Sequence, residues 1–357
     1  MSKIRVLQII DSLNIGGAEV LAVNTANLLY RENVDSYLCV TRKEGDLKRN
    51  IDFNRVNYFF LERKRTIDFK AILKLKKIII QNRIDIIHAH SSSYFIATCV
   101  KMIYPKVKIY WHDHFGNSEF LNNREKFPLK FCSRFFHSII SVNDDLKIWS
   151  QNKLKTKKVY QLNNFAFFKN DLKLTVLKGL NNKRIIHLAG FTEQKDHINL
   201  LKAFKIINKI EKEWSLHLVG KNYNDEYSNS VVDFINENNF HEKVFMYDSC
   251  IDIKNILNQS TIGVLSSKSE GLPISLLEYG LANLPVLATD VGNCAKVINN
   301  KNGIVAPNRS DIFAERLLKI IQNETISENI RIELNKNVVE KFTSEIFLKN
   351  LINIYTN

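Results

Sequence analysis

Short runs of apolar residues alternate along most of the chain with segments in which apolar residues recur every three to four positions. A short apolar run predicts a buried β-strand, and the longer spacing predicts an amphipathic helix. Strands that are apolar throughout are typical of parallel sheets covered by helices on both faces, so the alternation predicts an α/β fold with doubly wound sheets. The eleven expected strands occupy residues 4–10, 36–41, 85–90, 108–113, 138–143, 184–190, 215–220, 243–248, 262–267, 285–290 and 303–307.

One segment, 151–183, is rich in Lys and Asn and interrupts this alternation. A chain of 357 residues is long enough for two domains, because a domain typically takes about 150 residues. We therefore expect a first domain over 1–165 and a second over 170–343, with a junction near 165–180. The run SEIFLKNLINIY predicts a last amphipathic helix within 344–357. Ligands of doubly wound sheets bind beyond the carboxyl ends of the strands, so the expected site is a cleft between two facing domains.

Charge is distributed unevenly along the chain. Residues 1–165 hold 28 Lys and Arg against 15 Asp and Glu, whereas the remainder holds 23 against 22. A basic half predicts an anionic partner, which leaves nucleic acid, anionic lipid headgroups and a phosphorylated acceptor open; a general bias toward Lys, Asn and Ile is the alternative. The five cysteines are scattered without a CxxC pair, and neither a signal peptide nor an apolar run of membrane-spanning length is found. These features predict a cytoplasmic protein with reduced cysteines.

Two loops carry residues suited to an anion. Gly16-Gly17 follows the first strand and opens a helix, where backbone amides can approach a ligand closely; a plain strand-to-helix turn is the alternative. Lys195 lies in the loop of GFTEQKDHINLLKAF, where its ammonium could meet a phosphate or remain a solvated surface charge.

Four histidines lie at the ends of two expected strands. His88 and His90 are two positions apart and point to one face, and His112 and His114 do likewise. Four imidazoles could bind a metal, but no carboxylate or thiol is placed to complete a site, so we predict none. A polar role in the cleft is expected for His112 or His114.

The stretch SEGLPISLLEYGLA carries two carboxylates around a turn and a helix. Pro273 suits the first helical position, and the amides of that first turn favour a diphosphate. Glu270 would then face a sugar attached to the diphosphate. Glu278 lies among apolar neighbours, where an unpartnered charge is costly, so we expect it to accept hydrogen bonds from a ribose.

The order IGGAE, a histidine at a strand end, GFTEQKDHINLLKAF and SEGLPISLLEYGLANLPVLATDVG resembles the retaining glycosyltransferases of family 4. The resemblance covers nearly the whole chain and implies the GT-B fold, two Rossmann-like domains facing a cleft, with the final helix packing back on the first domain. Glu270 and Glu278 match the E-x7-E motif of that family. The residues that it implies in binding the nucleotide sugar are Gly16, Gly17, Gly190, Lys195, Ser267, Glu270, Gly271, Leu272, Pro273 and Glu278.

The resemblance also implies roles in catalysis. Lys195 would neutralise the leaving diphosphate, Glu270 would contact the sugar, and His112 would lie close to the reacting sugar. His88, His90 and His114 are candidates on the acceptor side. The implied reaction moves a hexose from a UDP- or GDP-sugar to a hydroxyl of a glycan or lipid-linked glycan with retained configuration, without a cofactor or metal. The implied pathway is bacterial capsule, exopolysaccharide or lipopolysaccharide synthesis.

Two stretches depart from the family pattern. Phe191-Thr192 stands where the family usually has an arginine, so one phosphate-binding cation is missing, and Lys268 is the candidate to replace it. Asn293 and Lys296 replace a Gly and a Glu of the family.

Alternative functions follow from the same features. Another GT-B enzyme, such as a nucleotide-sugar epimerase or a phosphorylase, would share the architecture. A nucleic-acid-binding protein would use the basic half and bind in a salt-sensitive way, although no such motif is found. The stretches 69–83 and 124–138 combine cations with apolar residues. Each is either an ordinary amphipathic helix or a contact with the inner face of an anionic membrane.

Overall fold

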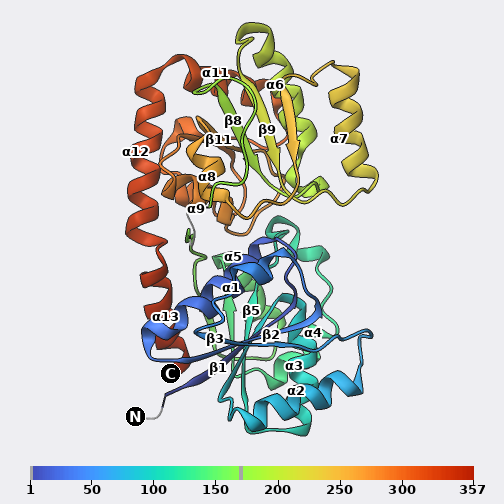
Figure 1. Cartoon of the computed structure of the whole chain (residues 1–357). Coiled ribbons are helices and arrows are strands. Elements are labelled where there is room, and N and C mark those ends of the chain that lie inside the picture. The colour runs from blue at the N-terminus through green and yellow to red at the C-terminus, as the bar shows by residue number, and fades with distance from the viewer. Residues whose placement is uncertain (1–2, 169–171) are drawn as a thin grey trace. The chain divides into compact units, whose positions relative to one another are not determined.

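The computed structural model describes residues 3–168 and 172–357, so residues 169–171 of the expected domain junction lie outside it. The described chain divides into two compact units (Figure 1). The first unit contains the chain up to Asn164 together with Ser344–Asn357, and the second extends from Phe165 to Thr343. The final helix therefore belongs to the first unit, although it follows the second in the sequence.

The first unit contains a seven-stranded sheet in the order β3-β2-β1-β4-β5-β6-β7, with all pairs parallel. Apolar side chains from α2 and α3 pack on one face of this sheet, and α1 packs on the other. Its elements are β1 (Arg5–Ser12), α1 (Gly17–Leu28), β2 (Asp35–Lys43), β3 (Val56–Phe60), α2 (Phe69–Gln81), β4 (Ile86–His90), α3 (Tyr94–Ile103), β5 (Lys108–Asp113), α4 (Leu129–Cys132), β6 (Ser138–Ser141), α5 (Asp144–Lys153), β7 (Val159–Gln161) and α13 (Ser344–Thr356).

The second unit contains a six-stranded parallel sheet in the order β10-β9-β8-β11-β12-β13. One continuous apolar core fills the space between this sheet and its helices. Its elements are β8 (Arg184–Leu188), α6 (His197–Ile210), β9 (Ser215–Val219), α7 (Glu226–Glu237), β10 (Val244–Tyr247), α8 (Ile253–Asn258), β11 (Ile262–Leu265), α9 (Ile274–Leu281), β12 (Val286–Thr289), α10 (Cys294–Val297), β13 (Ile304–Val305), α11 (Ser310–Gln322) and α12 (Glu324–Lys341).

Both sheets reverse their strand order at one point, which is where doubly wound folds bind ligands. In the first unit the chain winds outward from β1 on one side and from β4 on the other; in the second unit the reversal lies between β8 and β11. The loops that follow these four strands therefore lie beside one another within each unit. The two doubly wound units confirm the predicted fold class, and all eleven expected strands are present.

Two edge strands, β3 and β7, were not among the expected ones. β7 is only three residues long, and β3 has one buried residue out of five, so neither gives the continuous apolar run that predicts a buried strand. Within the described residues, no helix combines the length and the apolar character that crossing a bilayer requires.

Candidate functional site

In the second unit, hydrogen bonds join the loop after β8 to the loop after β11. The amide of Lys268 donates to the carbonyl of Gln194 at 2.8 Å, and the Gln194 side chain donates to the carbonyl of Ser269 at the same distance. The Ser266 hydroxyl donates to the carbonyls of Lys195 and Asp196 at 3.0 and 3.1 Å. Segments 70 or more positions apart are thus held in one fixed arrangement at the switch point of the sheet.

This arrangement brings Lys195 and Glu270 together. The Lys195 Nζ lies 2.6 Å from Glu270 Oε1, and the Ser267 hydroxyl donates to the same oxygen at 2.7 Å. The Glu270 side chain is only 5% exposed, whereas that of Lys195 is 25% exposed. A buried carboxylate needs a cation and hydrogen-bond donors, and Lys195 and Ser267 supply them. The ammonium remains open to solvent on one side, where it can also meet a phosphate.

Helix α9 begins directly after this pair. Pro273 is the N-cap of α9 and Ile274 its first residue, so the expectation that Pro273 takes the first helical position was wrong by one residue. Its ψ of 125° keeps it extended, which is how an N-cap enters a helix. Gly271, Leu272 and Pro273 are all buried. The positive end of the α9 dipole lies three residues after Glu270 in the sequence.

Gly292 lies directly against the backbone of the Glu270 turn. Its φ is +53°, and a Cβ at this position would lie 2.1 Å from the carbonyl oxygen of Glu270. The adjacent amide of Asn293 donates to the carbonyl of Gly271 at 2.9 Å. A glycine is required here because any side chain would push the Glu270 turn away.

Glu278 lies in α9 with its side chain partly buried. Its carboxylate has no hydrogen-bond or ion-pair partner among the described residues. Burial without compensation raises the pKa of this carboxyl from 4.5 to about 7. A carboxylate kept unpaired at this cost is suited to a ligand that donates hydrogen bonds.

The residue that follows Gly190 does not supply a second cation. Phe191 is buried and stacks on the ring of His197, with centroids 4.6 Å apart, so the residue that replaces the family arginine packs in the core. Lys268 Nζ lies 3.1 Å from Glu193 Oε1 at the surface. Gly190 itself is partly exposed, and a Cβ there would make only ordinary contact with the Tyr223 ring.

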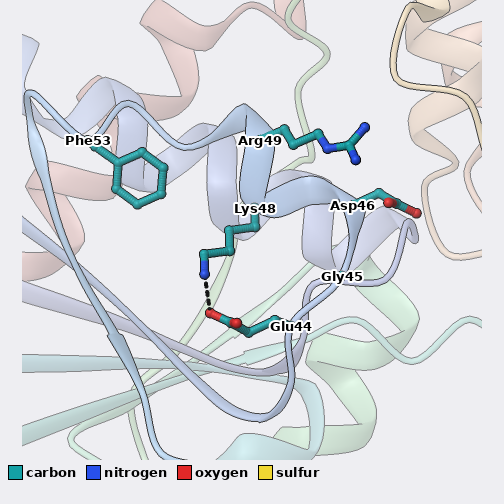
Figure 2. Close-up of a pocket in the computed structure, with 6 residues that line it drawn as sticks. All are labelled: Glu44, Gly45, Asp46, Lys48, Arg49 and Phe53. Carbon is teal, nitrogen blue, oxygen red and sulfur yellow. Dashed lines mark ion pairs between the residues drawn. The ribbon is translucent and has the colours of Figure 1, made fainter.

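In the first unit, Gly16 is the N-cap of α1 and Gly17 its first residue. The backbone at Leu13 and Asn14, just before this turn, lies directly against Gly45. A Cβ at Gly45 would lie 2.4 Å from the carbonyl oxygen of Leu13. Beside Gly45 is an open hollow of about 430 Å³ (Figure 2). Lys48 and Glu44 both line this hollow and form an ion pair with each other (Figure 2). Lys48 Nζ lies 2.7 Å from Glu44 Oε1. The remaining lining residues are Asp46, Arg49 and Phe53.

The four histidines at the ends of β4 and β5 lie in one group, in which His88, His90 and His112 are buried and His114 is partly exposed. His88 Nε2 and His112 Nδ1 are 3.0 Å apart, and so are His90 Nδ1 and His114 Nε2. Burial lowers the pKa of all four, to about 3 for His88 and His114 and well below 6.5 for His90 and His112, so the rings are neutral. The structure therefore brings together all the histidines that the sequence singled out.

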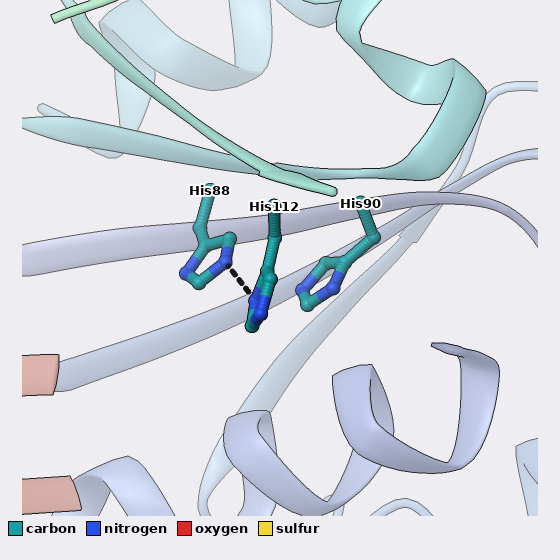
Figure 3. A group of neighbouring side chains, drawn as sticks. All are labelled: His88, His90 and His112. Atoms are coloured by element: carbon teal, nitrogen blue, oxygen red, sulfur yellow. Dashed lines mark hydrogen bonds between the residues drawn. The ribbon is translucent and has the colours of Figure 1, made fainter. Parts of the chain in front are cut away.

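Three of these histidines, His88, His90 and His112, also come close enough to be considered as metal ligands (Figure 3). One nitrogen from each lies within 4.8 Å of the others. The group contains no carboxylate to balance a cation, and His88 and His112 already share a hydrogen bond. The absence of a metal stays a prediction.

A cavity of about 580 Å³ opens next to this group at the end of β5. One wall contains a buried ion pair, in which the Arg124 guanidinium donates two hydrogen bonds, of 2.7 and 2.8 Å, to the Asp113 carboxylate. The guanidinium also lies over the Phe115 ring, 4.3 Å from its centroid. A cavity with aromatic walls and a few fixed polar groups suits a small polar ligand such as a sugar. The lining residues are Ser91, Ser92, Tyr94, Trp111, Asp113, His114, Phe115, Gly116, Asn123, Arg124, Glu125, Phe127, Pro128 and Leu129.

Sequence reasoning missed Gln8 and Tyr355, which join the histidine group from β1 and α13. His90 Nε2 lies 2.7 Å from Gln8 Oε1, and the Tyr355 hydroxyl lies 2.5 Å from His88 Nδ1. Both residues are buried. The available signal for Gln8 was a polar residue inside an otherwise apolar strand. Tyr355 gave no signal, because tyrosine is common on the apolar face of a helix.

Two family models match the chain: "Glycosyltransferase Family 4" at residues 15–164 and "Glycosyl transferases group 1" at residues 170–340. The matches follow the two units of the fold and together span most of the sequence. The chain therefore belongs to the family 4 type of glycosyltransferases, and it has the GT-B fold.

Individual relatives agree with this assignment. The chain is 24% identical over 345 residues to the O-antigen biosynthesis glycosyltransferase WbnH of Escherichia coli, a match that covers 94% of this chain and 96% of the relative. It is 19% identical over 258 residues to a poly(ribitol-phosphate) alpha-N-acetylglucosaminyltransferase of Staphylococcus aureus. That match covers 71% of this chain and 50% of the relative, so the chain spans about half of that protein's length.

Among solved structures, the chain resembles Anabaena HepE in complex with UDP and glucose. The TM-score is 0.80 at 14% identity, and the match covers 99% of both chains. At this identity the likeness establishes the fold alone.

Proposed function

We propose that this glycosyltransferase takes its sugar from a nucleotide-diphosphate donor and transfers it with retained configuration to a hydroxyl of a glycan or lipid-linked glycan. The proposed pathway is the synthesis of a bacterial surface polysaccharide. The observation that carries the proposal is the Lys195–Glu270 pair at the entry of α9, followed by the unpartnered carboxylate of Glu278. The named relatives in O-antigen and teichoic-acid synthesis agree with it.

The charges of this site match the charges of such a donor. The diphosphate would accept hydrogen bonds from the first amides of α9, where the helix dipole is positive. Lys195 would then share its ammonium between Glu270 and the diphosphate. Charge accumulates on that diphosphate as the bond to the sugar breaks, so a fixed cation there stabilises the transition state more than the ground state.

The two carboxylates would bind hydroxyl groups. Glu270, held by Lys195 and Ser267, would accept hydrogen bonds from hydroxyls of the transferred sugar. Glu278 would accept the two vicinal hydroxyls of the ribose, which donate to two oxygens at once. Gly190 and the Gly16-Gly17 turn would let backbone approach the nucleotide, and no step requires a metal or a cofactor. We assign no protein nucleophile, because the leaving phosphate can deprotonate the acceptor hydroxyl.

A thermal shift panel tests the donor proposal. The purified chain is melted with EDTA present against UDP-, GDP-, ADP- and dTDP-sugars, alongside Glu278→Gln and the control Glu315→Gln. Glu315 is an exposed glutamate of α11 that pairs with Lys319. One nucleotide class should raise the melting temperature of the wild type and of Glu315→Gln, and not that of Glu278→Gln. No shift for any nucleotide, or an equal shift in both variants, would contradict the proposed site.

For the acceptor, we propose the cavity beside His114. Its aromatic walls would stack on a sugar ring, and its polar groups Ser91, Asp113 and Arg124 would orient the sugar hydroxyls. Phe115→Ala removes one aromatic wall of the cavity and keeps the polar side chains that line it. It should therefore raise the KM for the acceptor and leave the KM for the donor unchanged. Steady-state kinetics with a matched donor and acceptor would measure both constants, and an effect on the donor KM alone would contradict this placement.

We further propose that the first unit meets an anionic membrane surface. Helix α2 exposes a row of large apolar residues, Phe69, Leu73 and Ile80, which are 75%, 60% and 47% exposed. Lys70, Lys74 and Lys77 are exposed on the same helix. Apolar side chains flanked by lysines are typical of interfacial helices.

Vesicle flotation tests the membrane proposal. The wild type should float with vesicles that contain anionic phosphatidylglycerol and should not float with pure phosphatidylcholine. A variant with Phe69→Ser and Leu73→Ser should lose this binding and keep its melting temperature, because both side chains are largely exposed. A variant that still floats with anionic vesicles would contradict the role of α2.

A further inference from the structure

A polar seam crosses the middle of the first unit's sheet. The strands β1, β4 and β5 present Gln8, His88, His90, Tyr110 and His112 toward helix α13, while the residues that alternate with them pack in the apolar core on the opposite face. All five seam residues are at most 1% exposed. Parallel strands in such sheets are normally apolar on both faces, so this many buried polar groups calls for a function.

The hydrogen bonds of the seam form one connected chain. We call it the histidine relay. It begins at His114, whose ring lines the acceptor-side cavity, and ends at His112. The order of its members is His114, His90, Gln8, Tyr355, His88 and His112.

The side-chain amide of Gln8 sets the direction of the first branch. Its Oε1 can only accept, so the hydrogen on His90 lies on Nε2, at 2.7 Å from that oxygen. A neutral His90 then has a lone pair on Nδ1, which accepts from His114 Nε2 at 3.0 Å. Both rings in this branch therefore carry their hydrogen on Nε2.

The same amide sets the direction of the second branch. Gln8 Nε2 can only donate, and it donates to the Tyr355 hydroxyl at 3.4 Å. The Tyr355 hydroxyl then donates its own hydrogen to His88 Nδ1, which accepts. His88 therefore carries its own hydrogen on Nε2.

The second branch ends at His112. His88 Nε2 donates to His112 Nδ1 at 3.0 Å, so the hydrogen of His112 lies on Nε2. This atom is buried and has no hydrogen-bond partner among the described residues. The opposite direction would make His88 donate to a Tyr355 oxygen that already accepts from Gln8, which would leave the phenolic hydrogen without an acceptor in the relay. The relay therefore ends in a single N–H donor for which no described residue supplies an acceptor.

We infer that Gln8, Tyr355 and His88 are positioning residues that hold His112 in the tautomer with its hydrogen on Nε2, so that His112 donates a hydrogen bond to an oxygen of the sugar substrate. This inference rests on the proposed function for the identity of the substrate. The relay assigns a task to the last helix of the chain: α13 supplies the hydroxyl that fixes the tautomer of a ring on β5. Tyr355 touches no substrate and acts only through His88.

Nuclear magnetic resonance reads the tautomer directly. Protein labelled with ¹⁵N-histidine is studied by long-range ¹H–¹⁵N correlation at pH 7.5, with each ring assigned from single His→Gln variants. His112 is expected to show a protonated Nε2 and an unprotonated Nδ1. In Tyr355→Phe, His88 loses the donor that fixed it, and the His112 shifts should move toward the average of two tautomers.

Tyr110→Phe is the matched control. The Tyr110 hydroxyl is equally buried and donates to the backbone carbonyl of Tyr355 at 3.2 Å, but it lies outside the relay. We expect this variant to keep the His112 tautomer and the kcat of the wild type. Tyr355→Phe should lower kcat by roughly tenfold and change the donor KM by less than about twofold, the pattern of a lost transition-state interaction.

Several results would overturn the inference. If the hydrogen of His112 in the wild type lies on Nδ1, the direction of the hydrogen bonds in the relay is the reverse of the one inferred. If zinc stays bound in the presence of EDTA with His88 and His112 as ligands, the group is a metal site and not a hydrogen-bond relay. Equal kcat values in Tyr355→Phe and Tyr110→Phe would remove its role in catalysis. The tautomer measurement needs no donor. If no nucleotide sugar is turned over, the proposed function fails while the relay is still decided by the spectrum.

Discussion

The partly buried carboxyl of Glu278 lowers the stability of the fold when it is ionised, although the ionised form is the one expected to bind the donor. This cost in stability depends on pH in a predictable way. Burial raises the pKa of this group in the folded protein from 4.5 to about 7. Between these values the folded chain binds more protons than the unfolded chain, so stability is lost as the pH rises through this window. Glu278→Gln replaces the carboxyl with a neutral group of the same shape and removes that loss.

The magnitude follows from the shift in pKa. One pKa unit corresponds to about 1.4 kcal/mol, so the ionised carboxyl costs about 3 kcal/mol at pH 8 and about 1.4 kcal/mol at pH 5.5. Glu278→Gln should therefore gain about 2 kcal/mol more over the wild type at pH 8 than at pH 5.5. The same variant should lose donor binding, because an amide cannot accept both ribose hydroxyls.

Urea unfolding at the two pH values measures the free energy of unfolding of the wild type and of the variant. Hydrogen exchange in peptides from α9 follows the unfolding of the second unit alone. Glu315→Gln is the control, because the neighbouring Lys319 lowers the pKa of that exposed glutamate from 4.5. Its carboxyl is therefore ionised in the folded and the unfolded chain at both pH values, so the stability difference between this variant and the wild type should be the same at pH 5.5 and pH 8. An advantage of Glu278→Gln that is equal at pH 5.5 and pH 8, or a variant less stable than the wild type at pH 8, would refute the reasoning.

Three further predictions concern single contacts. Lys195→Ala should lower the rate of donor turnover by roughly 10²–10³-fold, as expected for a group that stabilises the leaving charge; a loss smaller than tenfold in steady-state kinetics would remove Lys195 from that role. Gly292→Ala should destabilise the fold by at least about 1–3 kcal/mol, because its φ is +53° and the new Cβ would meet the Glu270 carbonyl; an unchanged melting temperature would show that the turn has room. Arg124→Met should cost about 3–5 kcal/mol in urea unfolding by leaving Asp113 buried without its partner. Adding Asp113→Asn should restore part of that loss, and a double variant no more stable than Arg124→Met would contradict the assignment.

Much of the fold was predictable from the sequence because strand and helix periods are local. The predicted runs found every central strand of both sheets, since a strand covered on both faces is apolar throughout. The strands β3 and β7 were missed because an edge strand is held on one side only and does not need the same apolar run. The place of α13 in the first unit was expected from the resemblance alone. Its amphipathic pattern predicts a helix, but it does not indicate which unit that helix packs against.

The candidate site was only partly predictable. Lys195 and Glu270 were each singled out, but their contact depends on the strand order that places β8 beside β11, and no local pattern encodes that order. Gly292 gave no signal of its close approach to Glu270, because that approach exists only in the folded unit. Only part of the relay was predictable. The paired histidines could be predicted to share a face, whereas Gln8 lies 82 positions from His90 and Tyr355 lies 267 positions from His88.

The central claim is that the chain transfers a sugar from a nucleotide donor with retention of configuration, and donor turnover followed by ¹H NMR tests it most directly. Water can replace the unknown acceptor, and the nucleotide sugar that raises the melting temperature serves as the donor. We expect release of the nucleoside diphosphate, and we expect the first free sugar to have the anomeric configuration of the donor. Lys195→Ala should slow this release. A first-formed sugar of inverted configuration, or a donor that binds and is never turned over, would contradict the claim.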